Sequence, residues 1–349
     1  MRLSRTVNVA LTVLAFLVIT GLTAWGALAI YYSDVSSGGL RVGLTMAFAL
    51  AGLVALVGCG FSRWRWRALA GFLALFAIVV TWWRAIEPSN DRDWQPHVAV
   101  LPYATIAGNL VTVYNIRNFQ YRTETDFTPA YYDKTFDLNK LEAVDVLAVY
   151  WMGPEIAHVF LSFGFQGGDY LSVSIETRTE RGEGYSTIKG FFKQYELFYV
   201  VADERDVIRV RTNYRNDPPE DVYLYRVHGP VENGKRVFLD YIHKINALKM
   251  KPEFYNTLTT NCTTNIWLHT RINPGHLPFS WKLLLSGYVP AYLYEAGRLD
   301  TSVPFPELQR RAHINARARE ADQADDFSRR IRAGTAGGKR LAWIGESVP

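Results

Sequence analysis

Three long apolar segments open the chain. Residues 6–32 are almost wholly apolar, and residues 42–61 and 68–83 form two further runs. A helix needs roughly 20 apolar residues to cross a bilayer. Trp82 and Trp83 at the end of the third run are typical of a membrane interface. Because the first run is too long for the apolar core of a signal peptide, the pattern predicts three retained membrane-spanning helices.

The remaining chain shows strand patterns followed by helical ones. The aromatic and β-branched content of 157–165 predicts a strand, apolar and polar residues alternate at 170–176, and a Gly-Gly turn would join the two. Residues 233–250 have helical periodicity, and Asn261 is a good N-cap for a second helix. Weaker strand patterns occupy 112–117, 119–123, 144–151, a hairpin of 195–201 with 207–212, and 222–227. Hairpins followed by helices predict an α+β fold with a mainly antiparallel sheet.

The pattern also divides the chain into parts. We expect a membrane anchor at 1–84, a polar linker at 85–98, one soluble domain at 99–300 and a charged tail at 301–349. Within the tail, residues 308–331 are charged enough for a solvated helix. The apolar and aromatic segment 281–297 fits core packing, an acyl-chain groove or a membrane-facing surface.

Basic residues orient the predicted anchor. Arg2 and Arg5 precede the first run, and three arginines lie at 63–67, between the second and third runs. The loop at 33–40, between the first two runs, contains Asp34 and no basic residue. The positive-inside tendency then places everything after the third run outside the cytoplasm. This predicts a bacterial inner-membrane protein whose C-terminal domain lies in the periplasm.

Charge follows the same division. Residues 1–84 contain seven arginines and a single acidic residue, whereas the whole chain has a formal net charge of +5. The soluble part is therefore slightly acidic, and the basic character belongs to the anchor. The main evidence for nucleic-acid binding would be a basic soluble domain, and this soluble part is not basic.

Of the two cysteines, Cys262 is the candidate for a chemical function. Cys59 lies inside the second apolar run and Cys262 lies outside the membrane, so the two cannot form a disulfide. Cys262 would open the helix capped by Asn261, where free backbone N–H groups and the positive helix end favour a thiolate. The residue is either a small buried side chain or a nucleophile. A lone thiol in an oxidising compartment favours the second interpretation.

A cysteine nucleophile needs a base. His97 lies in the linker and His313 in the tail, while His269 lies two helical turns from Cys262, roughly 10 Å away. His158 opens an apolar strand and is the preferred base, although a buried structural histidine would fit the same pattern. The sequence contains no metal-ligand spacing and no nucleotide or cofactor motif, so we expect no metal and no cofactor.

Four segments in order resemble one protein family. They are 116–122 (IRNFQYR), 156–165 (IAHVFLSFGF), 174–178 (SIETR) and 255–264 (YNTLTTNCTT). Together they are similar to a family named after the lipoprotein N-acyltransferase Lnb, over about residues 95–275. The order of His before Asn-Cys also resembles circularly permuted papain-like proteins related to NlpC-type hydrolases. The Lnb enzyme, however, has its membrane helices after the periplasmic domain, whereas three apolar runs precede it here.

This resemblance implies a permuted papain-like domain with thiol acyltransferase activity. Cys262 would attack a phospholipid ester, hold the acyl group as a thioester and pass it to an amine such as a lipoprotein N-terminus. His158 would be the base and would form an ion pair with the thiolate. The Asn261 side chain would help to bind the oxyanion, and Glu176 would orient His158.

The role of Glu176 depends on the length of the loop between the two predicted strands. A two-residue turn at Gly167-Gly168 would place His158 and Glu176 on opposite faces of the hairpin, leaving Glu176 to pair with Arg178 or Arg181. A three-residue loop or a bulge would bring His158 and Glu176 together.

Two other functions compete with acyl transfer. One is a cysteine peptidase or amidase that acts on peptidoglycan peptides, and the other is a non-catalytic module that binds lipid or an envelope partner.

Overall fold

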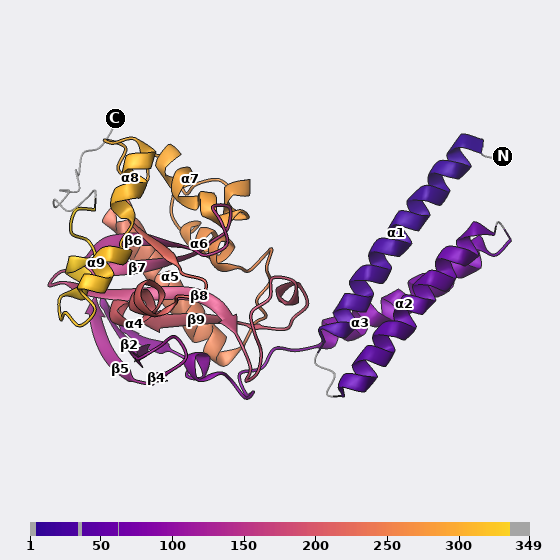
Figure 1. The fold of residues 1–349 in the computed structure, drawn as a ribbon, viewed down its shortest axis with the longest axis horizontal. Coiled ribbons are helices and arrows are strands. Elements are labelled where there is room, and N and C mark those ends of the chain that lie inside the picture. Colours follow the sequence, from indigo (N-terminus) through magenta and orange to yellow (C-terminus); the bar gives the residue numbers. More distant parts are fainter. Residues whose placement is uncertain (1–4, 34–36, 62, 336–349) are drawn as a thin grey trace. The chain divides into compact units, whose positions relative to one another are not determined.

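The computed structural model describes residues 5–33, 37–61 and 63–335, and it separates into two units (Figure 1). One unit contains the chain up to Ser89 together with Tyr185–Glu196, and the other contains the remaining residues. Arg2 and Asp34, which entered the predicted orientation, lie outside the described residues, as does the chain beyond residue 335.

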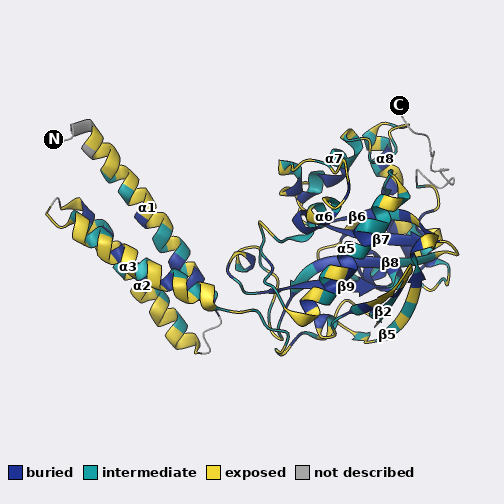
Figure 2. Ribbon diagram, turned by 180° about the vertical axis from the view of Figure 1, so that it is seen from behind, coloured by how far each residue is buried: buried dark blue, intermediate teal, exposed yellow. Residues whose placement is uncertain are grey.

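Three apolar helices form the first unit. They are α1 (Arg5–Tyr31), α2 (Gly38–Gly60) and α3 (Arg65–Ala85). Each is long and apolar enough to cross a membrane, as the sequence predicts. Most of their apolar side chains are exposed (Figure 2), which is typical of helices that face lipid. The Lys193 ammonium group donates to the carbonyls of Trp83 and Ile86, so it satisfies groups at the end of α3.

A mixed, mostly antiparallel sheet forms the centre of the second unit. Its order is β1 (Tyr103–Ala107), β2 (Leu110–Arg117), β9 (Glu196–Ala202), β8 (Asp169–Arg178), β7 (Ala157–Phe165), β6 (Leu141–Tyr150) and β10 (Asp221–Arg226). Strand β5 (Tyr131–Asp137) also pairs with β2, while β3 (Gln120–Tyr121) and β4 (Phe127–Thr128) form a small separate sheet. The predicted α+β class is confirmed, whereas the permuted papain-like connection stays a prediction.

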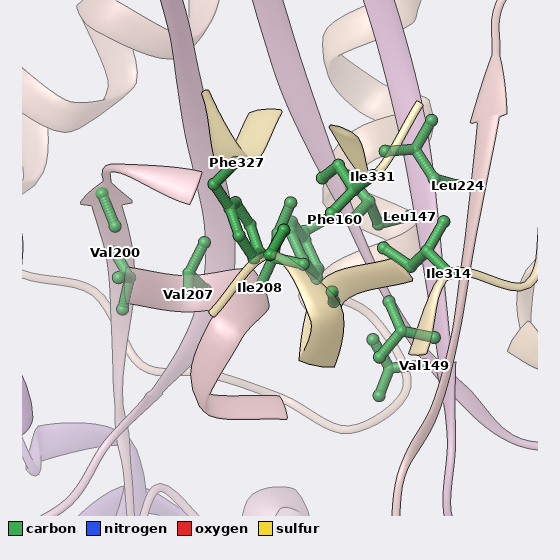
Figure 3. Close-up of a cluster of buried hydrophobic side chains, with 14 of the residues drawn as sticks. Leu147, Val149, Phe160, Val200, Val207, Ile208, Leu224, Ile314, Phe327 and Ile331 are labelled. Atoms are coloured by element: carbon green, nitrogen blue, oxygen red, sulfur yellow. The ribbon is translucent and has the colours of Figure 1, made fainter. Parts of the chain in front are cut away.

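Helices cover both faces of this sheet. The side chain of Phe163 on β7 packs against Phe238 and Tyr241 of α5 (Val231–Met250), and α6 (Cys262–Thr270) lies on the same strand. The neighbouring Phe160 points to the opposite face. There it joins a buried apolar cluster that includes residues of β6, β9 and the C-terminal helices (Figure 3).

The predicted strand at 207–212 is wrong. This segment continues α4 (Glu204–Arg209) into a π-helical turn, Val210–Tyr214. Asp203 caps α4 by accepting a hydrogen bond from the backbone N–H of Arg205. The cap and the acidic first turn outweigh the β-branched composition that suggested a strand.

The predicted solvated helix at 308–331 is also wrong. The segment forms α8 (Phe305–Ala312), α9 (Asn315–Glu320) and α10 (Phe327–Arg330), and its apolar residues are buried in the cluster of Figure 3. Arg332 follows them and forms ion pairs with the buried carboxylates of Asp145 and Glu204, at 2.8 and 2.6 Å. The charged residues of this segment face outward or form internal ion pairs. Its charged composition therefore did not indicate that its apolar residues are buried. The chain also includes α7 (Val289–Glu295).

Candidate active site

The N-terminus of α6 positions Cys262. The Asn261 side chain accepts a hydrogen bond from the Thr264 backbone N–H at 2.9 Å, which is the predicted cap. The backbone N–H groups of Val159, Thr263 and Cys262 itself lie against the thiol sulfur. Residue Cys262 is partly buried and partly exposed.

The Val159 N–H is available because the sheet opens at this point. The recorded pairing of β7 with β8 runs from Phe165–Asp169 to Leu161–Val173 and stops before Val159. Helix α6 contacts both strands there. The N–H that reaches the sulfur belongs to the peptide group between His158 and Val159, so the backbone of the predicted base lies against the predicted nucleophile.

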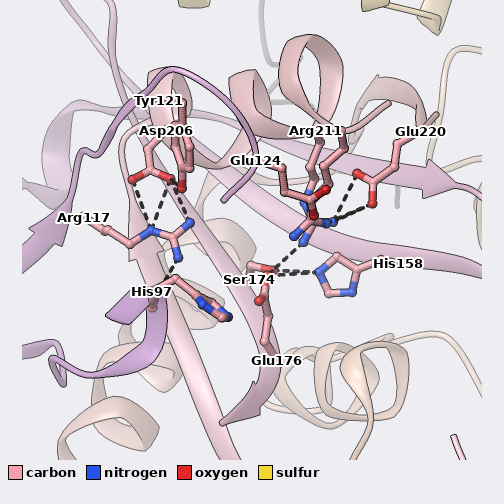
Figure 4. A network of polar contacts seen from close by, with 11 residues as sticks. His97, Arg117, Tyr121, Glu124, His158, Ser174, Glu176, Asp206, Arg211 and Glu220 are labelled. Carbon is pink, nitrogen blue, oxygen red and sulfur yellow. Dashed lines mark hydrogen bonds and ion pairs between the residues drawn. The ribbon is translucent and has the colours of Figure 1, made fainter. Parts of the chain in front are cut away.

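His158 is held by a relay of hydrogen bonds (Figure 4). Its Nε2 lies 2.7 Å from the Ser174 hydroxyl oxygen, and that hydroxyl donates to Glu176 Oε1 at 2.8 Å. A hydroxyl has one proton, and here it is given to the carboxylate. Nε2 must therefore carry the histidine proton, which leaves Nδ1 unprotonated and able to act as a base.

The hairpin register explains how Glu176 reaches His158. The loop between β7 and β8 has three residues, because Phe165 pairs with Asp169. Continued along the strands, this register places residue 176 opposite residue 158, on the same face, and the Nε2–Oε1 distance is 3.7 Å. Of the two arrangements that the sequence allowed, the three-residue loop is present.

Glu176 forms an ion pair with Arg211 and not with the arginines considered from the sequence. The guanidinium of Arg211 donates to Oε1 at 2.9 Å and also contacts Glu220 (Figure 4). The guanidinium of Arg178 instead donates to backbone carbonyls elsewhere, and Arg181 pairs with Asp93.

Burial sets the protonation of the site. It lowers the pKa of His158 to about 3, and it raises the pKa of the Cys262 thiol despite the surrounding N–H groups. Burial alone would also raise the pKa of Glu176, but Arg211 and His158 hold it well below its usual range. The resting site therefore contains a thiol and a neutral imidazole. The expected ion pair between them is not the resting state, because both groups are too poorly solvated to be charged.

No hydrogen bond joins the Cys262 sulfur to the His158 ring in the part of the chain that the structure describes. The Asn261 side chain is held in place by the local backbone: Oδ1 accepts from Thr264 of the first helical turn, and Nδ2 donates one of its hydrogens to the Thr257 carbonyl in the preceding loop at 2.7 Å. Among residues 5–33, 37–61 and 63–335, no cluster of acidic, histidine and cysteine side chains could bind a metal ion.

Two other histidines have structural contacts. His269 lies between Asp240 of α5 and Tyr199 of β9, each 2.7 Å away, so it fixes α6 against its neighbours. His97 was assigned to the linker, but its backbone carbonyl accepts a hydrogen bond from Arg117. Burial lowers the pKa of its ring to about 4.

Sequence reasoning missed two side chains that contact the candidate site residues. Ser174 lies two residues before Glu176 on the polar face of the predicted strand, so the alternation contained a signal for it. Arg211 had no usable signal, because its segment was assigned to a strand and its partner is distant in the sequence.

The fold and the site define a class: a membrane-anchored protein whose α+β domain places a partly exposed cysteine beside a histidine relay. Residues 127–287 match the family described as the Lnb N-terminal periplasmic domain, and this segment contains His158, Glu176 and Cys262. The family resemblance found in the motifs is thereby confirmed. The chain is a membrane protein with a periplasmic domain. No curated protein and no solved structure matches it.

Proposed function

We propose that the protein is a thiol acyltransferase of the bacterial inner membrane. It transfers a fatty acyl chain from a phospholipid, through a Cys262 thioester, to an amine such as a lipoprotein N-terminus. One observation supports this proposal most: the Cys262 sulfur lies at a helix N-terminus and against the Val159 backbone N–H, next in the chain to His158, whose ring is held by Ser174 and Glu176. The membrane anchor and the family match favour a lipid donor over a distant cell-wall substrate.

The first half of the reaction forms the thioester. His158 Nδ1 takes the thiol proton, and the sulfur attacks the ester carbonyl carbon of the phospholipid. The C–O bond then breaks, and the departing alkoxide of the lysophospholipid takes the proton from the imidazolium. Glu176 stabilises that imidazolium through Ser174, as the third residue does in other nucleophile–base pairs.

The second half transfers the acyl group. The amine attacks the thioester carbonyl, an amide bond forms, the C–S bond breaks, and the released proton returns to the sulfur through His158. In both halves the oxyanion binds to the Cys262 backbone N–H. The second N–H of the Asn261 amide, beyond the one donated to Thr257, is the proposed additional donor.

Labelled phospholipid tests the proposal. Full-length protein is incubated with vesicles that contain phosphatidylglycerol labelled in its acyl chains, and protein-bound label is measured before and after neutral hydroxylamine, which cleaves thioesters. We expect hydroxylamine-sensitive label on wild-type protein and on Cys59→Ser, the matched control, because Cys59 is buried in α2. Cys262→Ser should carry none.

Two results contradict acyl transfer. One is the absence of label on wild-type protein, and the other is equal labelling of Cys262→Ser. Cleavage of a peptidoglycan peptide by the unlabelled wild-type protein would then favour a peptidase, and its absence would favour a binding module.

A further inference from the structure

An apolar cavity of about 180 Å³ lies between the sheet and two helices of the second unit. Strands β6 and β7 form one wall, and helices α5 and α6 form the other. The segment around Leu283 and Leu293 closes a third side. Its lining is mostly apolar, and the charged or strongly polar exceptions are His228, Asn233, Asn273, His276 and Arg298.

The cavity begins beside the candidate nucleophile. Val159 and Thr263 both line it, and the backbone N–H groups of these two residues lie against the Cys262 sulfur. The sulfur therefore lies next to two residues of the cavity wall.

The cavity then runs along α6, away from the sulfur. Thr263, Ile266, Trp267 and Thr270 line it at the spacing of one helix face, which spans about 10 Å. Helix α5 runs antiparallel to α6, since Asp240 contacts His269 and Arg236 contacts Asn273.

Gly234 of α5 therefore lies towards the far end, opposite Val144 of β6. A Cβ atom on Gly234 would lie 3.0 Å from the Val144 side chain, so this glycine keeps that part of the cavity narrow but open. A glycine inside a helix is unfavourable compared with alanine, so its presence here has a packing reason.

The outer surface next to the cavity is also apolar. Leu283 lines the cavity, whereas its neighbours Trp281, Leu284 and Leu285 are 56%, 37% and 40% exposed. Of the interpretations of this segment, core packing holds for buried residues such as Leu283 and Val289, but not for the exposed ones. Exposed large apolar residues beside an apolar cavity are typical of a surface that meets lipid.

We propose that this cavity binds the fatty acyl chain of the Cys262 thioester and limits its length. The proposal rests on the acyl transfer proposed above. Its volume equals about six waters at their share of liquid volume, roughly 30 Å³ each, so it takes several methylene groups. Each methylene that leaves water improves binding roughly fourfold. Because Gly234 and Val144 bound the far part, the structure assigns them control over the preferred chain length.

Competition between two donors tests this assignment. The full-length protein is reconstituted in vesicles that contain equal amounts of dioctanoyl and dipalmitoyl phosphatidylglycerol, and the Cys262 adducts are counted by intact-protein mass spectrometry. Gly234→Leu fills the far end from the helix, and Val144→Phe fills it from the strand. We expect each variant to lower the ratio of palmitoyl to octanoyl adduct at least tenfold. Leu268→Phe, on the exposed face of α6, should leave the ratio unchanged.

The alkylation rate of Cys262 by iodoacetamide shows that each variant keeps an intact site, and using two variants protects the test against misfolding of one. An unchanged ratio in a variant that still forms adducts overturns the acyl cavity while leaving acyl transfer standing. The absence of any adduct on wild-type protein refutes the proposed function, and the acyl cavity with it.

Discussion

Glu176→Gln is the substitution that most directly tests the histidine relay. Glu176 Oε1 accepts hydrogen bonds from both Ser174 and Arg211, and it lies 3.7 Å from His158 Nε2. Glutamine keeps the shape of the side chain and removes its charge. The imidazolium that forms during thiol attack then loses its nearest negative charge.

The magnitude follows from this distance. Two unit charges about 4 Å apart interact by about 4 kcal/mol in a partly solvated protein environment. Arg211 neutralises part of the Glu176 charge, so we expect roughly half of that value, about 2 kcal/mol, to be lost. At about 1.4 kcal/mol per factor of ten, the rate of adduct formation should fall about 30-fold. Cys262→Ser, in contrast, should form no adduct at all.

The assay measures the rate of phospholipid-derived adduct formation and the alkylation rate of Cys262 against pH. A weaker base should move the alkylation profile of Glu176→Gln to higher pH, which a purely structural role would not do. Glu142→Gln, at an exposed position of β6, is the control and should behave as wild type. A Glu176→Gln rate within twofold of wild type, with an unshifted profile, would refute the relay.

Three further predictions follow from protonation and topology. Because burial raises the pKa of the Cys262 thiol, the rate of Cys262 alkylation should keep increasing above the pH at which a free cysteine reaches half-maximal reactivity. A rate that is constant from pH 5 to 8 would instead indicate a preformed ion pair. His158 and His97 have pKa values lowered to about 3 and about 4, so below pH 6.5 the unfolded chain binds protons that the folded chain does not. The free energy of unfolding in detergent should then fall by up to about 1.4 kcal/mol per pH unit per histidine as the pH drops towards 4. Urea titrations that give the same curve at pH 7 and pH 5 would contradict this prediction. A reporter that fluoresces only in the cytoplasm, fused after Pro349, should stay dark, and a bright fusion would reverse the predicted orientation.

The membrane anchor and the hairpin were predictable because their signals are local. Apolar runs of sufficient length define the spans, aromatic and β-branched content defines the strand that carries His158, and alternation defines the strand that carries Glu176. The Asn261 cap was also legible in the sequence, because a cap depends on a few adjacent residues.

The rest of the site depends on long-range contacts. Whether Glu176 faces His158 is decided by the hairpin register, which the two glycines of the loop left open. The Arg211 pair joins positions 35 residues apart, and nothing in the local pattern of 207–212 indicates it. The pKa of Cys262 was misjudged for a similar reason: the helix N-terminus is a local feature, whereas burial depends on the whole fold.

The ion pairs of Arg332 have a consequence for how the domain folds after export. The family match ends at residue 287, but the core is completed only when residues 305–332 cover it and Arg332 neutralises Asp145 and Glu204. Until that segment has crossed the membrane, the Glu204 carboxylate lacks the Arg332 guanidinium with which it pairs in the folded domain, and Asp145 has only Arg226, so the closed domain is unfavourable. During this interval the Cys262 thiol is unprotected in an oxidising compartment. The time between export of Cys262 and export of Arg332 is therefore the period in which the nascent protein is most vulnerable to oxidation and mixed disulfides.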